Sequence, residues 1–179
     1  MFSFKRPSSA TALGCASALV SVVALAAATA SPAAPTRAAG TPRCATSGLA
    51  IWLDTQGNGA AGSIFYNLEL TNLSGRTCTL LGDPGVSAVD LDGRRLGVGA
   101  SHDTSQRPRL VTLARGATAT AVLQIVEAGN FPASVCREVT AAGLRVYPPA
   151  QRASKVVPFP FQACSRAGQG VLSVRAVQQ

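Results

Sequence analysis

The chain has few of the side chains that most catalytic and metal sites require. Its 179 residues include one histidine and one methionine, and that methionine is Met1. Exported copper carriers bind their metal through clusters of Met and His, so this function is excluded. Zinc sites are disfavoured too, because no CxxC pair is present. We therefore expect no metal and no cofactor.

The same scarcity argues against an enzyme. A serine hydrolase needs a base that a third group orients, but the only histidine, His102, is followed directly by Asp103, and adjacent residues of an extended chain point apart. Glycosidases need two facing carboxylates, and the close pair Asp90 and Asp92 flanks a turn signal. No phosphate-binding GxxxxGK or GxGxxG motif occurs in a strand-to-helix setting. We predict that the protein is not an enzyme.

The first thirty residues have the pattern of a secretory signal peptide. Lys5 and Arg6 precede an uncharged run over 11–30 that ends in the small residues Ala28-Thr29-Ala30. No stop-transfer pattern follows, so we expect cleavage after Ala30 and no transmembrane segment afterwards. The predicted location is secreted or associated with the cell envelope.

Cys15 raises an alternative. The segment Ala12-Leu13-Gly14-Cys15 is similar to the lipidation box of a bacterial lipoprotein. A lipidated cysteine has to follow the apolar segment, whereas the most apolar stretch here, ALVSVVALAAA, lies after Cys15. We favour a discarded signal peptide and keep lipidation of Cys15 as the alternative.

The remainder of the chain has the size of one domain. Removing 30 of the 179 residues leaves 149, enough for one sizeable core. Residues 31–43 are rich in Pro, Ala and Gly and offer little to bury, which predicts a disordered lead-in. We expect the folded domain at 44–179.

The domain is basic. Losing Lys5 and Arg6 lowers the formal net charge from +8 to +6, and thirteen of the fourteen remaining cations are arginine. An exported basic domain attracts anionic wall polymers or lipid headgroups over long range. Alternatively the skew reflects a GC-rich genome and a solvated surface, since no cationic run exceeds a pair. The candidate ligand surface comprises Arg94, Arg95, Arg107 and Arg109. Nothing favours nucleic acid except the charge, because base stacking needs interleaved aromatic side chains.

Four cysteines remain in the predicted exported domain, so we expect disulfides. Opposed residues of an antiparallel hairpin have a constant sum of positions. Cys44 and Cys78 centre on residue 61, within the Gly-rich segment GNGAAG, and Cys136 and Cys164 centre on residue 150, within PPA. We predict the bonds Cys44–Cys78 and Cys136–Cys164, each closing the open ends of one hairpin, with a bulge able to shift the register.

The periodicity of the domain is that of strands. Ile64, Tyr66, Leu68 and Leu70 alternate with more polar residues. The alanines of 116–128 permit a helix, but that segment also alternates, and we prefer a strand. Gly, Pro and Asp separate about nine short strands, which predicts an all-β, immunoglobulin-like antiparallel β-sandwich.

Two local segments predict turns. Asp92-Gly93 tolerates the positive φ that a type I′ turn needs at both central residues, so we expect a tight hairpin there. Asn72-Leu73-Ser74 matches a glycosylation sequon, and we interpret it as a turn.

Taken together, these segments resemble a known family. The first cysteine, TNLSGRTCTLLGDPGV, LDGRRLG, VTLARGATATAVL, a third cysteine, LRVYPP and a closing C…VLSVRAV are similar to an actinobacterial family of exported proteins, domain of unknown function 4232. The resemblance covers roughly Cys44 to Val177 and departs from the family pattern at Asp83, Arg115 and Arg175. It implies a secreted or envelope-attached β-sandwich and supplies no catalytic residues.

The sequence is consistent with two functions. The first is a non-catalytic binding or structural module of the cell envelope, in which arginines or loops at one end of the sandwich hold an anionic cell-wall polymer or an envelope protein. The second is a diffusible secreted effector, such as an enzyme inhibitor, that presents the loop GASHDTSQRPRL at 99–110.

Overall fold

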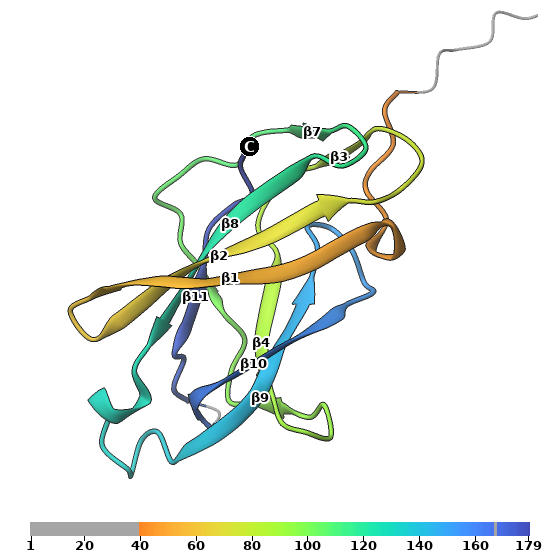
Figure 1. Ribbon diagram of the computed structural model, residues 1–179. Coiled ribbons are helices and arrows are strands. Elements are labelled where there is room, and N and C mark those ends of the chain that lie inside the picture. The colour runs from red at the N-terminus through yellow and green to blue at the C-terminus, as the bar shows by residue number, and fades with distance from the viewer. Residues whose placement is uncertain (1–39, 167) are drawn as a thin grey trace, which may run out of the picture. The chain divides into compact units, whose positions relative to one another are not determined.

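The computed structural model describes residues 40–166 and 168–179 (Figure 1). The predicted signal peptide, Cys15 and most of the predicted lead-in lie outside these residues. Within them, all regular structure is β-strand except two 3₁₀ helices of three residues each. The prediction of an all-β protein is confirmed.

The described residues form eleven strands, more than the nine or so predicted. The strands are β1 (Leu49–Ala60), β2 (Ser63–Asn72), β3 (Cys78–Leu80), β4 (Gly85–Val89), β5 (Arg95–Leu96), β6 (Ser101–His102), β7 (Val111–Leu113), β8 (Thr118–Val126), β9 (Glu138–Tyr147), β10 (Lys155–Cys164) and β11 (Leu172–Val174). The 3₁₀ helices are η1 (Thr46–Gly48) and η2 (Ala128–Asn130). The two exposed residues of β6 lie in a polar segment without alternation, which explains why the sequence did not predict this strand.

The strands form two large sheets and one small one. One sheet has the order β1-β2-β8-β11-β6, the other has the order β10-β9-β4-β5, and β3 pairs with β7. Pairing is antiparallel throughout these sheets except between β6 and β11, which run parallel. Leu68 and Leu123 of the first sheet and Leu144 and Val146 of the second belong to one buried cluster, so the two large sheets share a core. The finer expectation of an immunoglobulin-like sandwich stays a prediction.

The pairing of β2 with β8 confirms the predicted alternation. Leu68 lies opposite Ala121 and Leu70 opposite Ala119, and all four side chains are fully buried. The intervening residues, such as Glu69, face away from the core and are only partly buried. The alanine-rich segment is therefore a strand, because its small inward residues pack beneath the leucines of its neighbour.

Strand β10 closes one edge of the second sheet and carries two prolines. Pro158 and Pro160 are exposed, whereas Phe159 and Phe161 pack toward the core. The Phe159 ring lies edge-on to Tyr66 with ring centroids 5.0 Å apart. Because proline has no backbone N–H, this edge is a poor template for pairing with another chain.

The predicted hairpin at Asp92-Gly93 is confirmed, but the type I′ turn is wrong. Gly93 has φ of 73°, whereas Asp92 does not have positive φ. The Gly93 amide donates to the Asp90 carbonyl at 2.9 Å, and the Asp90 amide donates to the Arg94 carbonyl at 3.0 Å. The loop therefore has three residues and ends in a left-handed glycine. The Asp90 carboxylate, which accepts from the Arg94 amide at 2.8 Å, helps to hold this wider loop.

Both predicted disulfides are present. The Cα atoms are 4.8 Å apart in Cys44–Cys78 and 4.7 Å apart in Cys136–Cys164. In the β9–β10 hairpin Cys164 lies opposite Glu138, two residues after Cys136. The second bond therefore closes the open end of its hairpin, as the sequence predicted.

The first disulfide has a different setting from the expected one. Strands β1 and β2 do form a hairpin centred near residue 61, but Cys78 begins β3, which pairs with β7 instead of continuing β2. The chain beside it runs parallel, since Cys44 donates to the Thr79 carbonyl and Thr79 donates to the Pro42 carbonyl, each at 2.9 Å. The expected antiparallel staple is thus wrong at this bond. Pro42 and Arg43, just before Cys44, thus take part in this pairing.

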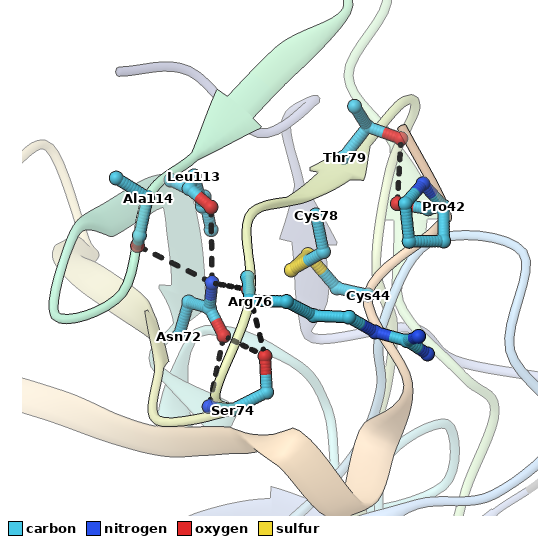
Figure 2. The surroundings of a disulfide bond; sticks show 9 residues. All are labelled: Pro42, Cys44, Asn72, Ser74, Arg76, Cys78, Thr79, Leu113 and Ala114. Atoms are coloured by element: carbon cyan, nitrogen blue, oxygen red, sulfur yellow. Dashed lines mark hydrogen bonds between the residues drawn. A yellow bond between two sulfur atoms is a disulfide. The ribbon is translucent and has the colours of Figure 1, made fainter. Parts of the chain in front are cut away.

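Asn72 explains why the chain leaves β2 before reaching Cys78. Its buried side-chain amide donates to the carbonyl oxygens of Arg76, Leu113 and Ala114 at 3.0, 2.9 and 3.2 Å (Figure 2). Its Oδ1 accepts from the backbone and the hydroxyl of Ser74 at 3.0 and 2.6 Å. The predicted turn is confirmed. The sequon asparagine is a fully buried structural residue, so it is inaccessible to glycosylation in the folded domain.

Candidate anion-binding sites

The adjacent cations Arg94 and Arg95 have different surroundings. Arg94 Nε lies 2.9 Å from Asp90 Oδ2, and its Nη2 lies 3.1 Å from Asp92 Oδ2. The backbone amide of Arg94, with its guanidinium, also holds the pKa of Asp90 below its ordinary value. Two carboxylates thus offset the charge of Arg94, which makes the hairpin tip a poor cationic surface.

Arg95 instead lines a hollow on the second large sheet, together with Arg145 and Tyr147 of β9. The sequence analysis missed Arg145. A signal for it exists, because Leu144 and Val146 are fully buried and the alternation of a strand directs Arg145 and Tyr147 to the opposite face. What the sequence does not reveal is that β9 lies near Arg95.

Arg107 and Arg109 line a second, open groove. Its other lining residues are Gln106, Leu110, Val111, Gln178 and Gln179, and its volume is about 590 Å³. None of these lining residues is Asp or Glu, and Gln179, the last residue of the printed sequence, adds its α-carboxylate beside the two guanidinium groups. Arg107 and Arg109 are separated by Pro108, which favours an extended backbone and so places both side chains on one side.

The four arginines predicted as one surface therefore lie at two separate sites. The hairpin between β4 and β5 lies in the lower part of Figure 1, whereas the C-terminal end, beside the Arg107–Arg109 groove, lies in the upper part. A third hollow, next to the Cys136–Cys164 bond, is lined by Arg137 and Arg166. Six arginines thus line three distinct hollows that share no lining residue.

Two residues of the loop 99–110, His102 and Asp103, each contact a charged side chain from another part of the chain. His102 Nδ1 lies 3.6 Å from Asp83 Oδ2, and Arg175 Nε donates to Asp103 Oδ2 at 2.7 Å. The Arg175 contact is the main cause that lowers the pKa of Asp103 from 3.8 to about 2. Asp103 thus binds Arg175 and does not orient the imidazole.

Within residues 40–166 and 168–179, no group of three or more His, Cys, Asp or Glu side chains is arranged to hold a metal ion. No helix in the same part of the chain has the length and apolar character needed to cross a bilayer.

Comparison with known proteins gives a match to one family model. The model described as Domain of unknown function (DUF4232) matches residues 44–178, which includes every strand and both disulfides. No curated protein and no solved structure matches the chain.

Proposed function

The chain belongs to the family described as domain of unknown function (DUF4232), and from this premise we propose that it is an exported, non-catalytic module that binds an anionic polymer of the cell envelope. Its two disulfides suggest an oxidising, extracellular environment. Its net charge of +8, or +6 after the predicted signal cleavage, favours anionic partners.

The observation that carries this proposal is the groove of Arg107 and Arg109. Its two guanidinium groups donate charge-assisted hydrogen bonds to phosphate or carboxylate oxygens. The Gln178 amide donates to the side-chain oxygen of Gln106, and the remaining donors and acceptors of these two amides and of Gln179 suit the hydroxyls and ester oxygens of a polymer.

The arginines outside the groove have a supporting role. Their field attracts a polyanion before contact is made, and this attraction is screened over about 8 Å at physiological ionic strength and about 3 Å at 1 M. Binding of this kind is weakened by salt. A protein partner recognised through shape and apolar contacts is much less sensitive.

Cell fractionation tests this proposal. We expect the exported protein in the wall fraction and its release by salt washes, because screening weakens the contacts of the groove. Reversing both groove charges in R107E/R109E should move the protein to the culture medium. R115E/R152E provides the matched control, since Arg115 and Arg152 are exposed and line none of the three hollows. Wild-type protein that is found only in the medium would instead favour a diffusible effector.

A further inference from the structure

The outer face of the second large sheet contains a hollow that is separate from the groove of Arg107 and Arg109. We propose that this hollow, lined by Arg95, Arg145, Ser87 and Tyr147, binds a single oxyanion group, either a phosphate monoester or a carboxylate. The site shares no lining residue with the groove of Arg107 and Arg109. Anion binding in this hollow can therefore be tested independently of polymer binding in the groove.

The register of the sheet brings these side chains together. Ser87 of β4 lies opposite Arg145 of β9, and Gly85 lies opposite Tyr147. On the other side of β4, Arg95 pairs with Val89. The strands β5 and β9, which lie on either side of β4, thus each supply an arginine, and β4 supplies the hydroxyl of Ser87.

Small residues form the floor. Gly85, Ser87, Gly99 and Ala100 line the hollow, and none has a side chain larger than a hydroxymethyl group. The Ala100 amide donates to the Val86 carbonyl at 2.8 Å, which fixes this segment against β4. A Cβ on Gly85 would lie 3.5 Å from the Cβ of Tyr147, so the tyrosine already occupies the space beside that glycine. The resulting volume of about 420 Å³ is ample for one oxyanion and part of its carrier.

The position of one arginine is fixed without using up its hydrogen-bonding capacity. Arg145 is half-buried, and its Nη2 donates to the Gly93 carbonyl at 2.7 Å. A guanidinium has five N–H donors, so this bond leaves others for a ligand. This anchor holds the charge in place before binding, which lowers the entropy lost on binding.

Neither arginine of the hollow is neutralised within the described part of the chain. The ion pairs found there involve Arg94, His102 and Arg175 as cations. The nearby acids of the hairpin, Asp90 and Asp92, are both paired with Arg94. The hollow thus keeps two positive charges and has no carboxylate among its lining residues.

This arrangement defines the chemistry of the ligand. Two guanidinium groups suit the planar or tetrahedral oxygens of a carboxylate or phosphate, and the hydroxyls of Ser87 and Tyr147 add neutral hydrogen bonds. The Tyr147 ring provides an apolar wall for the carbon atoms next to the oxyanion. A neutral ligand would leave both charges without a partner.

Titration of the ¹⁵N-labelled protein tests the site, with inorganic phosphate, glycerol phosphate and glucuronate as separate probes. We expect the amide signals of Ser87, Gly99 and Ala100 to shift with saturation. A stronger response to glycerol phosphate identifies a phosphate site, and a stronger response to glucuronate identifies a carboxylate site. Absence of saturable shifts with all three probes overturns the proposal.

Two variants separate a built site from general attraction. Losing one charged hydrogen-bond donor in R145Q or R95Q should weaken binding about tenfold. R115Q removes the same charge from an exposed turn and should leave the affinity unchanged. Equal weakening by R145Q, R95Q and R115Q would show that the anions respond only to overall charge, which contradicts the proposal.

A third variant keeps both charges and fills the hollow. In Gly99→Leu the new Cβ would lie 3.5 Å from the Val86 carbonyl oxygen, an ordinary contact, so the backbone accepts it. We expect loss of the saturable shifts at unchanged thermal stability. Unchanged affinity in G99L would place the anion elsewhere. This variant and R95Q remain informative if R145Q, which also loses the Gly93 bond, fails to fold.

Discussion

The side-chain amide of Asn72 donates a 2.9 Å hydrogen bond to the carbonyl oxygen of Leu113, a residue 41 positions later in the chain. Strand β2 ends at Asn72 and β7 ends at Leu113, so this contact ties the ends of two strands from different sheets. The same amide also faces the carbonyls of Arg76 and Ala114. A single buried side chain thus directs the chain from β2 toward β3.

Removing this amide should destabilise the domain. In Asn72→Ala the buried carbonyl of Leu113 loses its side-chain donor, and an unsatisfied buried polar group costs about 1 to 3 kcal/mol. Urea unfolding measures the change. Asn67→Ala, at an exposed position of the same strand, is the control and should change stability little. Equal stability of the two variants would show that the network around Asn72 is not structurally important.

Each disulfide should stabilise the domain to a similar degree. The bonds span 34 and 28 residues, and loops of this size are stabilised by about 3 to 4 kcal/mol on the chain-entropy model. We expect C44S/C78S and C136S/C164S to lower the free energy of unfolding by similar amounts. Peptide mapping of the unreduced protein should show the two native pairs. A bond from Cys44 to Cys136 or Cys164 would contradict the structure.

In the hairpin between β4 and β5, substitution by alanine should destabilise the domain at Gly93 but not at Asp92. Gly93 has φ of 73°, and a non-glycine residue in this left-handed region costs about 1 to 2 kcal/mol. A Cβ there would also lie 3.3 Å from Arg145 Nη2. Gly93→Ala should therefore lower the melting temperature, whereas Asp92→Ala should have little effect. Comparable losses in both variants would instead indicate a type I′ turn.

The contact between Asp103 and Arg175 should make the stability of the domain depend on pH in the acidic range. The folded-state pKa of Asp103 is about 2, below the ordinary value of 3.8. Its contribution is therefore fully present above about pH 4 and is lost as the pH falls toward 2. Asp103→Asn and Arg175→Gln should each lower the melting temperature at pH 6, and their difference from wild type should shrink as the pH approaches 2. A difference that is independent of pH would rule out this linkage.

The sequence predicted those parts of the fold that depend on local pattern. The alternation of Leu68 and Leu70 identified β2, and the centring of cysteine pairs on turn segments identified both disulfides. The setting of Cys78 was not predictable in this way, because the buried Asn72 network starts a new strand after β2. A polar residue within a sequon gives no sign that it will be buried.

The candidate sites show the same limit. Asp90 and Asp92 lie within four residues of Arg94, so ion pairs with this arginine were predictable from the sequence, but the two acids were interpreted only as residues that flank a turn. Arg95 and Arg145 are fifty residues apart, and they line one hollow only because β4 lies between β5 and β9. Local periodicity gives the face of a strand. It does not give the neighbours of that strand.

The central proposal is that the groove of Arg107 and Arg109 binds an anionic envelope polymer, and the most direct test is the association constant of the exported protein for isolated wall polymer as a function of salt. We predict binding that weakens steadily with salt, and a loss of at least about tenfold in R107E/R109E relative to R115E/R152E at low salt. The two variants carry the same net charge, so the difference reports on the groove itself. Binding that is insensitive to salt, or equal losses in the two variants, would contradict the proposal.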